Sequence, residues 1–340
     1  MKKIIRHIIP FIIVLLFMAS CERLVFSPNP PADPRATFQY LWDKIDRQYA
    51  YFDVKNVDWD EIYLEYAPKM HADLSDDSLF TYLGSMMNEL KDGHVNLFSE
   101  FNKSRYDIRR LGPNNIDFRF IQDNYLGADY YYTGPFIHDF IADDNIGYIR
   151  YSSFSSLFTD ENMMFMFERY ENTDGLIFDM RQNGGGYLMN VFKFLSYFTL
   201  TEEPVYTTCI KSGPDHEAFT ESVAEYSTPY DTVIHYLKPI AVLIDRGSYS
   251  ATSMFSLATL QLNNIFLVGD TTGGGLGMPN GGQLPNGWTY RFSITRTLTP
   301  DGLNYENGIP PDIYAVLDSS DMAQGYDTVI ETALDSLLGR

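Results

Sequence analysis

The chain has 340 residues, and its 45 acidic side chains against 25 lysines and arginines give a net charge of −20. An acidic balance this strong argues against nucleic acid as a partner, because proteins bind nucleic acids by neutralising phosphates with Lys and Arg. The length is enough for one large domain or two smaller ones.

The first residues have the order of a secretory signal peptide. A basic start is followed by a short apolar run over residues 8–18 and then by Ala19, Ser20 and Cys21. A membrane-spanning helix needs about 20 apolar residues, so the shorter run favours a cleaved signal over residues 1–20. Small residues that end directly at a cysteine resemble the lipobox of bacterial lipoproteins. This resemblance implies that Cys21 is lipidated and holds the protein to a membrane of the bacterial cell envelope, facing the periplasm or the surface.

Loss of the signal would remove three positive charges and take the net charge from −20 to −23. Lipidation would also leave Cys209 as the single free cysteine, so no intramolecular disulfide is expected. A small buried apolar role suits Cys209 better than that of a nucleophile.

A proline-rich segment, residues 21–36, is expected to be a tether rather than part of the fold. Residues 37–103 are predicted to form an N-terminal helical domain, because apolar residues recur there at three- and four-residue spacing. Asp58 and Ser75 are the expected helix N-caps. Residues 104–144 are rich in aromatic residues without helical periodicity, which predicts a β-rich connecting segment. The expected helices cover residues 37–52, 58–70 and 76–92.

From residue 145 to residue 340, short apolar runs alternate with helical patterns, which predicts an α/β domain with a mainly parallel sheet. Ligands usually bind at the carboxyl ends of such strands, so the loops that follow them are candidate sites. The expected strands cover residues 145–151, 174–180, 239–245 and 264–270, and the expected helices 161–171, 187–198, 250–262 and 326–339.

Three of these strand-end loops are unusual. Residues 184–186 are glycines that could present backbone N–H groups to an anion, as an oxyanion hole requires, although on this loop alone a tight turn is the better explanation. Ser250 stands where a strand is followed by a helix, and it is either an N-cap or a nucleophile favoured by the positive end of that helix. Residues 268–287 form a long Gly-, Pro- and Asn-rich loop of the kind that is commonly functional.

Five segments together resemble peptidase family S41, which includes the C-terminal processing peptidases, the tricorn core and the interphotoreceptor retinoid-binding proteins. They are LKDGHVNL (90–97), GLIFDMRQNGGG (175–186), DRGSYSATSMFSLA (245–258), IFLVGDTTGGG (265–275) and YENGIPPDI (305–313). The resemblance implies an α/β fold with a crotonase- or Clp-like ββα core and an N-terminal helical segment. It also implies that Ser250 is the nucleophile and that the amides of Ala251, Gly185 and Gly186 form the oxyanion hole.

The general base is where the sequence departs from one branch of the family. In the processing peptidases a lysine twenty-five residues after the serine is the base, but that position is Gly275 here. No Lys or Arg occurs between Arg246 and Arg291, so composition excludes a Ser–Lys dyad from this loop. The other branch takes a histidine from a motif like DGHVNL, which implies His94 as the base, and a neutral imidazole suits that role.

The acidic residue that orients the histidine is less sharply defined. Glu306 in YENGIPPD is the best match to the family's acid, and Asp301 and Asp312 remain in reserve. Asp92 is closer in sequence, but near neighbours on one turn rarely face each other. The tricorn branch also has a serine just before the histidine, where this chain has Gly93, so that relay is not expected.

The favoured interpretation is a lipid-anchored envelope serine endopeptidase that acts on polypeptides. About fifty residues, 95–144, separate His94 from the first strand of the α/β domain, too few for the PDZ domain of many processing peptidases. No cofactor is implied, and no His/Asp/Glu cluster has the spacing of a metal site. The alternative is a non-catalytic protein of the same fold that binds an apolar ligand or a peptide in the cleft, as the retinoid-binding relatives do.

Overall fold

A computed structural model of the chain describes residues 31–143, 145–230 and 234–340. The expected signal peptide, Cys21 and the tether up to residue 30 lie outside these described residues. The first described helix, α2 (Pro34–Gln48), begins within the stretch expected to be tether. Asp33 caps it by accepting from the backbone N–H of Ala36, and proline fits its first turn. None of the described helices is both long and apolar enough to cross a membrane.

The N-terminal lobe is built from four helices and a small antiparallel sheet. The two predicted N-caps are confirmed, since Asp58 accepts from Asp60 and Glu61 and Ser75 accepts from Ser78. The helices are α2, α3 (Phe52–Lys55), α4 (Trp59–Tyr66) and α5 (Asp76–Asn88), followed by β1 (Asn96–Phe98) and β2 (Lys103–Arg105).

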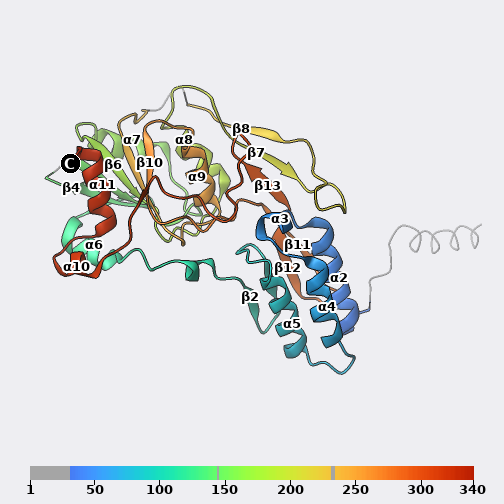
Figure 1. Cartoon of the computed structure of the whole chain (residues 1–340). Helices are drawn as coiled ribbons and strands as arrows, with labels where there is room; N and C mark the ends of the chain where they lie inside the picture. Colours follow the sequence, from blue (N-terminus) through green and yellow to red (C-terminus); the bar gives the residue numbers. More distant parts are fainter. Residues whose placement is uncertain (1–30, 144, 231–233) are drawn as a thin grey trace, which may run out of the picture.

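Two strands from late in the chain complete this lobe. The sheet order is β11-β12-β1-β2, where β11 is Pro279–Gln283 and β12 is Thr289–Ser293. Trp288, Tyr290 and Phe292 are buried in the same apolar core as the four helices. Figure 1 shows these orange strands beside the blue helices. The N-terminal lobe therefore contains more of the chain than residues 37–103.

The α/β lobe contains a seven-stranded sheet in the order β14-β10-β9-β6-β5-β4-β3. Neighbouring strands from β5 to β14 in this order run parallel, and β4 and β3 are antiparallel at one edge. The mainly parallel sheet that the sequence predicts is therefore present. The strands are β3 (Tyr131–Thr133), β4 (Phe136–Ile141), β5 (Ile146–Arg150), β6 (Gly175–Asp179), β9 (Ile240–Ile244), β10 (Ile265–Gly269) and β14 (Ile313–Tyr314).

Both faces of this sheet are covered, which explains why its central strands are apolar throughout. In β9, Val242 belongs to the core beneath α8 (Leu188–Leu195) and α9 (Ala251–Thr259), together with α7 (Asp160–Arg169). The adjacent Leu243 belongs to the core on the opposite face, beneath α11 (Thr328–Leu338). Figure 1 shows these helices on either side of the sheet.

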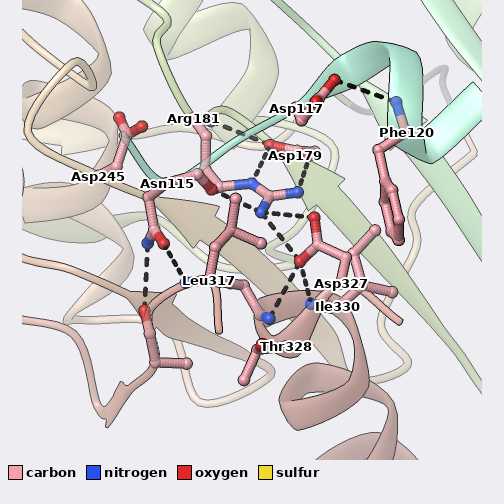
Figure 2. Close-up of polar contacts among 12 residues, drawn as sticks. Asn115, Asp117, Phe120, Asp179, Arg181, Asp245, Leu317, Asp327, Thr328 and Ile330 are labelled. Atoms are coloured by element: carbon pink, nitrogen blue, oxygen red, sulfur yellow. Dashed lines mark hydrogen bonds and ion pairs between the residues drawn. The ribbon is translucent and has the colours of Figure 1, made fainter. Parts of the chain in front are cut away.

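A third sheet and several short helices complete the structure. The third sheet has the order β13-β7-β8, formed by β13 (Thr295–Leu298), β7 (Glu203–Ile210) and β8 (Val223–Ser227). Cys209 in β7 is buried and free, as expected. The predicted β-rich segment also contains helix α6 (Phe118–Ile121), because Asp117 caps it by accepting from the N–H of Phe120 (Figure 2). The other short helices are η1 (Ala67–Lys69), η2 (Ile108–Leu111), η3 (Gln122–Leu126) and α10 (Ser319–Ala323).

A buried ion cluster fixes the carboxyl end of β6 (Figure 2). The guanidinium of Arg181 is fully buried and donates to Asp179 and to Asp327, which caps helix α11. It also donates to the backbone carbonyl of Asn115. Burial alone would raise the pKa of Asp179, but the guanidiniums of Arg181 and Arg150 hold it below its usual value. The cluster ties the distant segments around Asn115 and Asp327 to the strand end that precedes the glycine loop.

Candidate active site

Ser250 lies at the junction of β9 and α9 in a backbone conformation that is unusual for serine. Its φ is +58°, in the left-handed region that costs most side chains free energy. Two hydrogen bonds hold the junction there: Ser250 donates its N–H to the carbonyl of Gly274, and Tyr249 donates to the carbonyl of Asn183, each at 3.0 Å. The Ser250 side chain makes no capping hydrogen bond to α9, so helix capping does not explain this serine.

Asp245 joins the loop after β6 to the loop after β9, which leads to Ser250. Its Oδ1 accepts from the backbone N–H of Gln182 at 2.8 Å and from that of Gly247 at 2.9 Å. Ser248, the other serine beside Tyr249, is buried and donates to the carbonyl of Met180 at 2.8 Å. Ser248 therefore has a structural role between strands, and of these two serines it is Ser250 that lines the cleft described below.

His94 reaches Ser250 from the other lobe. It follows α5, and its Nε2 lies 3.0 Å from Ser250 Oγ although the two residues are 156 positions apart. Burial lowers the pKa of His94, an effect that Asp92 opposes and Arg291 reinforces. A lowered pKa keeps the imidazole neutral near pH 7, so it is able to accept a proton from the hydroxyl.

Glu306 is buried near this pair but makes no direct hydrogen bond to His94. Its Oε2 accepts from the backbone N–H groups of Leu276 and Gly277 at 2.7 and 3.2 Å. Its Oε1 lies 3.7 Å from Lys55 Nζ. Among the described residues, neither that oxygen nor His94 Nδ1 has a hydrogen-bond partner. The expected direct contact is absent, and the backbone amides engage only one of the two carboxyl oxygens. Burial and the negative charge of Asp92 raise the pKa of Glu306 to about 8.

Asp312 and Asp301, the two alternative candidates for the acidic residue, occupy other positions in the fold. Asp312 accepts from the backbone N–H of Leu267 at 2.7 Å, where it fastens the edge strand β14 to the sheet. Asp301 is exposed in the turn after β13. Neither forms a hydrogen bond with the imidazole of His94 within the described part of the chain.

Asp92 is the acidic residue that sequence reasoning set aside. It is buried and accepts from the backbone N–H of His94 at 2.7 Å. The hydroxyls of Tyr49, Tyr249 and Ser293 also donate to it, at 3.1, 3.3 and 3.0 Å. Asp92 thus fixes the backbone of His94 rather than its ring. The Asp-Gly-His order was a usable signal, because an aspartate commonly accepts from the N–H two residues later.

The ring of Tyr249 fills the space next to Gly275 and Gly93, the two positions at which the sequence departs from the family pattern. A Cβ at Gly275, the position of the lysine base, would lie 2.2 Å from Tyr249 Cζ, and the φ of Gly275 is +72°. A Cβ at Gly93, the position of the relay serine, would lie 2.9 Å from the Tyr249 hydroxyl oxygen. The same ring lies 4.9 Å from the imidazole of His94, centroid to centroid. One half-buried aromatic residue therefore closes both positions and contacts the histidine.

The expected oxyanion donors lie together beside Ser250, but they are not equally available. The N–H of Ala251 opens helix α9 and, like that of Gly186, has no hydrogen-bond partner among the described residues. The N–H of Gly185 instead donates to Asn183 Oδ1 at 3.0 Å. A Cβ on Gly185 would lie 2.7 Å from the Ala251 nitrogen, so glycine is what allows this close approach. In this structure Gly186 and Ala251 are the free donors.

These groups line a cleft of about 470 Å³ between the two lobes. Its walls include Tyr187, Leu188, Met254 and Met278, which favour apolar substrate side chains. Within the described residues no group of three or more His, Cys, Asp and Glu side chains is arranged to hold a metal ion.

Models of known protein families match both the α/β lobe and the N-terminal helices. The model of peptidase family S41 matches residues 145–315, and the model of the tricorn protease C1 domain matches residues 30–88. The carboxy-terminal processing protease CtpB of Bacillus subtilis (strain 168) is 27% identical over 171 residues, which cover 50% of this chain and 34% of that protein. The chain spans less than half the length of the curated relatives that it matches.

Solved structures agree with the family models. A crystallised protein of Parabacteroides merdae ATCC 43184, assigned as a peptidase, is 40% identical, with 90% of this chain and 97% of that chain covered and a TM-score of 0.87. Mature CPAF in complex with lactacystin has a TM-score of 0.67 at 12% identity, with 90% and 97% covered, and so shares the fold. The expected α/β fold with its helical N-terminal segment is confirmed. The chain belongs to peptidase family S41, a family of serine-type peptidases.

Proposed function

We propose that this chain is a serine endopeptidase that hydrolyses peptide bonds of polypeptides at the junction of its two lobes. The observation that carries this proposal is the 3.0 Å separation between Ser250 Oγ and His94 Nε2. This distance is within the range over which a base removes the proton of a nucleophile. The strained backbone of Ser250 and the free amides beside it support the same role.

The mechanism follows the positions of these groups. Ser250 Oγ attacks the substrate carbonyl carbon while its proton passes to His94 Nε2. The negative charge that develops on the carbonyl oxygen is stabilised by the N–H groups of Gly186 and Ala251 and by the N-terminus of α9. Gly185 joins them if its bond to Asn183 opens. The peptide C–N bond then breaks as His94 returns the proton to the leaving amine, and a water molecule hydrolyses the acyl-enzyme by the same steps in reverse.

Glu306 acts in this scheme as a positioning residue. It holds the backbone of Leu276 and Gly277. Burial lowers the pKa of His94, and the backbone of Gly277 is one of the groups that oppose this effect. Glu306 therefore acts on the base indirectly, by fixing a backbone segment of the cleft wall that also contains His94, and Asp92 fixes the base through its own N–H.

Attachment to the cell envelope through a lipid on Cys21 is part of the same proposal, and it rests on the lipobox-like N-terminus. To test this, the wild type and Cys21→Ser are expressed in a bacterial host and extracted with a phase-separating detergent. The fraction of each protein in the detergent phase and in the aqueous phase is then measured. The wild type is expected in the detergent phase and the variant in the aqueous phase. Equal partition of the two would contradict lipidation.

Labelling with a fluorophosphonate probe tests the catalytic assignment. We expect the wild type to be labelled, and we expect Ser250→Ala and His94→Ala to lose the label. Ser336→Ala removes an exposed serine of α11 and serves as the matched control that keeps it. Circular dichroism establishes that each variant is folded. A folded wild type that takes no label would favour the non-catalytic, cleft-binding alternative.

A further inference from the structure

Arg291 is a permanently charged side chain in the wall of the cleft, and the mechanism above does not use it. Among the described residues that line the cleft it is the single one that is charged at every working pH. It lies on β12, a strand from late in the chain that pairs with β1. No described carboxylate lies within ion-pairing distance of its guanidinium. A half-buried cation without a charged partner is costly, which points to a ligand that supplies the missing charge.

The guanidinium of Arg291 is held in one orientation. Its Nε donates to Asn96 Oδ1 at 2.7 Å, and Asn96 is buried and donates in turn to the carbonyls of Gly93 and Val95. With Nε engaged, the two terminal nitrogens remain as a pair of parallel donors. That pair matches the two oxygens of a carboxylate. The site is thus built by side chains of two paired strands.

The position of Arg291 relative to His94 decides which part of a substrate it meets. Arg291 pairs across the sheet with Asn96, two residues after the base, and its charge lowers the pKa of His94. The base must reach the amine that leaves, so the residues on the carboxyl side of the scissile bond lie on the His94 side of Ser250. Arg291 therefore faces the leaving segment of the peptide.

We propose that Arg291 binds a carboxylate of the leaving segment and makes this protein selective for cleavage close to such a group. The inference rests on the proposed peptidase function and deepens it. The carboxylate is either the free C-terminus of the polypeptide or an acidic side chain just after the cleaved bond. Both present the same two oxygens to the guanidinium, and the experiment below separates them.

The test uses three alanine-rich hexapeptides with a dansyl group at the N-terminus. The first ends in a free carboxylate, the second in a carboxamide, and the third in a carboxamide preceded by glutamate. The rate constant kcat/KM is measured for wild type, Arg291→Gln, Arg291→Lys and Arg119→Gln. Arg119 is an exposed cation paired with Asp123 on another face of the fold, so its variant controls for a lost positive charge. Affinity for the same peptides is measured by fluorescence anisotropy on Ser250→Ala, which needs no turnover.

We expect wild type and Arg119→Gln to prefer at least one carboxylate-bearing peptide over the carboxamide by roughly 10- to 100-fold, the range for a charged hydrogen-bonded pair. In Arg291→Gln the ratio is expected to fall to about one, and Arg291→Lys should keep part of it because the charge remains without the paired geometry. Preference for the first peptide identifies a C-terminal carboxylate, and preference for the third an acidic side chain.

Equal cleavage of all three peptides by the wild type would overturn the proposal, and so would an unchanged ratio in Arg291→Gln. In either case the peptidase function would stand. Failure of the wild type both to cleave and to take the fluorophosphonate label would instead refute the peptidase function, and the anisotropy ratio would then decide on the carboxylate site alone. Fluorophosphonate labelling of each Arg291 variant shows that its site remains assembled.

Discussion

Replacing Glu306 with glutamine isolates the energetic effect of one buried carboxyl group. The wild-type group has a pKa of about 8 in the folded protein, raised from an ordinary value of 4.5 mainly by burial. Glutamine has nearly the same shape and keeps a carbonyl oxygen that can accept from Leu276 and Gly277, but it does not titrate. The difference between the two proteins therefore reports the ionisation of Glu306.

The sign follows from the raised pKa. Folding favours the protonated carboxyl group, so its contribution is fully present below pH 4.5 and is lost as the pH rises towards 8. Each pH unit in that window costs about 1.4 kcal/mol. Relative to Glu306→Gln, the wild type should lose roughly 3 kcal/mol of unfolding free energy between pH 5.5 and pH 7.5, and up to about 5 kcal/mol over the whole window.

The measurement is urea-induced unfolding of both proteins at pH 5.5, 6.5 and 7.5, with the free energies extrapolated to water. Taking the difference at each pH removes the titration of every other group that the two proteins share. Glu65→Gln changes an exposed carboxyl group of an i,i+4 pair and should run parallel to the wild type. If the curve for Glu306→Gln is also parallel to the wild type, Glu306 ionises normally and the reasoning is wrong.

Three further outcomes test other parts of the structure. Gly275→Ala should be less stable than Gly127→Ala by about 1–3 kcal/mol. Both glycines have φ near +70°, but only a Cβ at position 275 would clash with the ring of Tyr249. Equal losses in thermal unfolding would contradict this. Asp327→Asn should lower the free energy of unfolding by about 3–5 kcal/mol, because it leaves the buried guanidinium of Arg181 without one charged partner. Asp123→Asn changes an exposed pair and should lower it by less than about 1 kcal/mol. Similar losses in the two variants would refute that reasoning. The apparent pKa of the acidic limb of the kcat/KM profile should lie below the ordinary histidine value of 6.5, because burial lowers the pKa of His94. An apparent pKa at or above 6.5 would contradict this effect of burial on the base.

The sequence predicted those parts of the fold that depend on local patterns. Continuous apolar runs correctly indicated a mainly parallel sheet. Asp58 and Ser75 were recognisable as caps because capping involves only neighbouring residues. It did not predict that β11 and β12 would join the N-terminal lobe. That pairing depends on a tertiary contact across almost two hundred residues, which no local period reveals.

For the candidate site, the sequence brought together Ser250 and His94 only through the family resemblance, and the structure places them 3.0 Å apart. The environment of Glu306 could not be predicted, because it depends on which backbone N–H groups a folded loop turns towards the carboxyl group. For the same reason, the sequence could not predict that the N–H of Gly185 donates to the side chain of Asn183.

The ring of Tyr249 restricts how this site could acquire a different base. Lysine at position 275 would need room that the ring now fills, and the backbone there also has a φ suited to glycine. A serine at position 93 meets the same obstacle. Any mutational route towards either alternative must first reduce residue 249 to a smaller side chain, which would also remove the hydroxyl that donates to Asp92. A protein on such a route would lose the Tyr249 hydroxyl before it gained the lysine or the serine. The histidine site is therefore separated from the lysine and serine sites of its relatives by an incomplete active site.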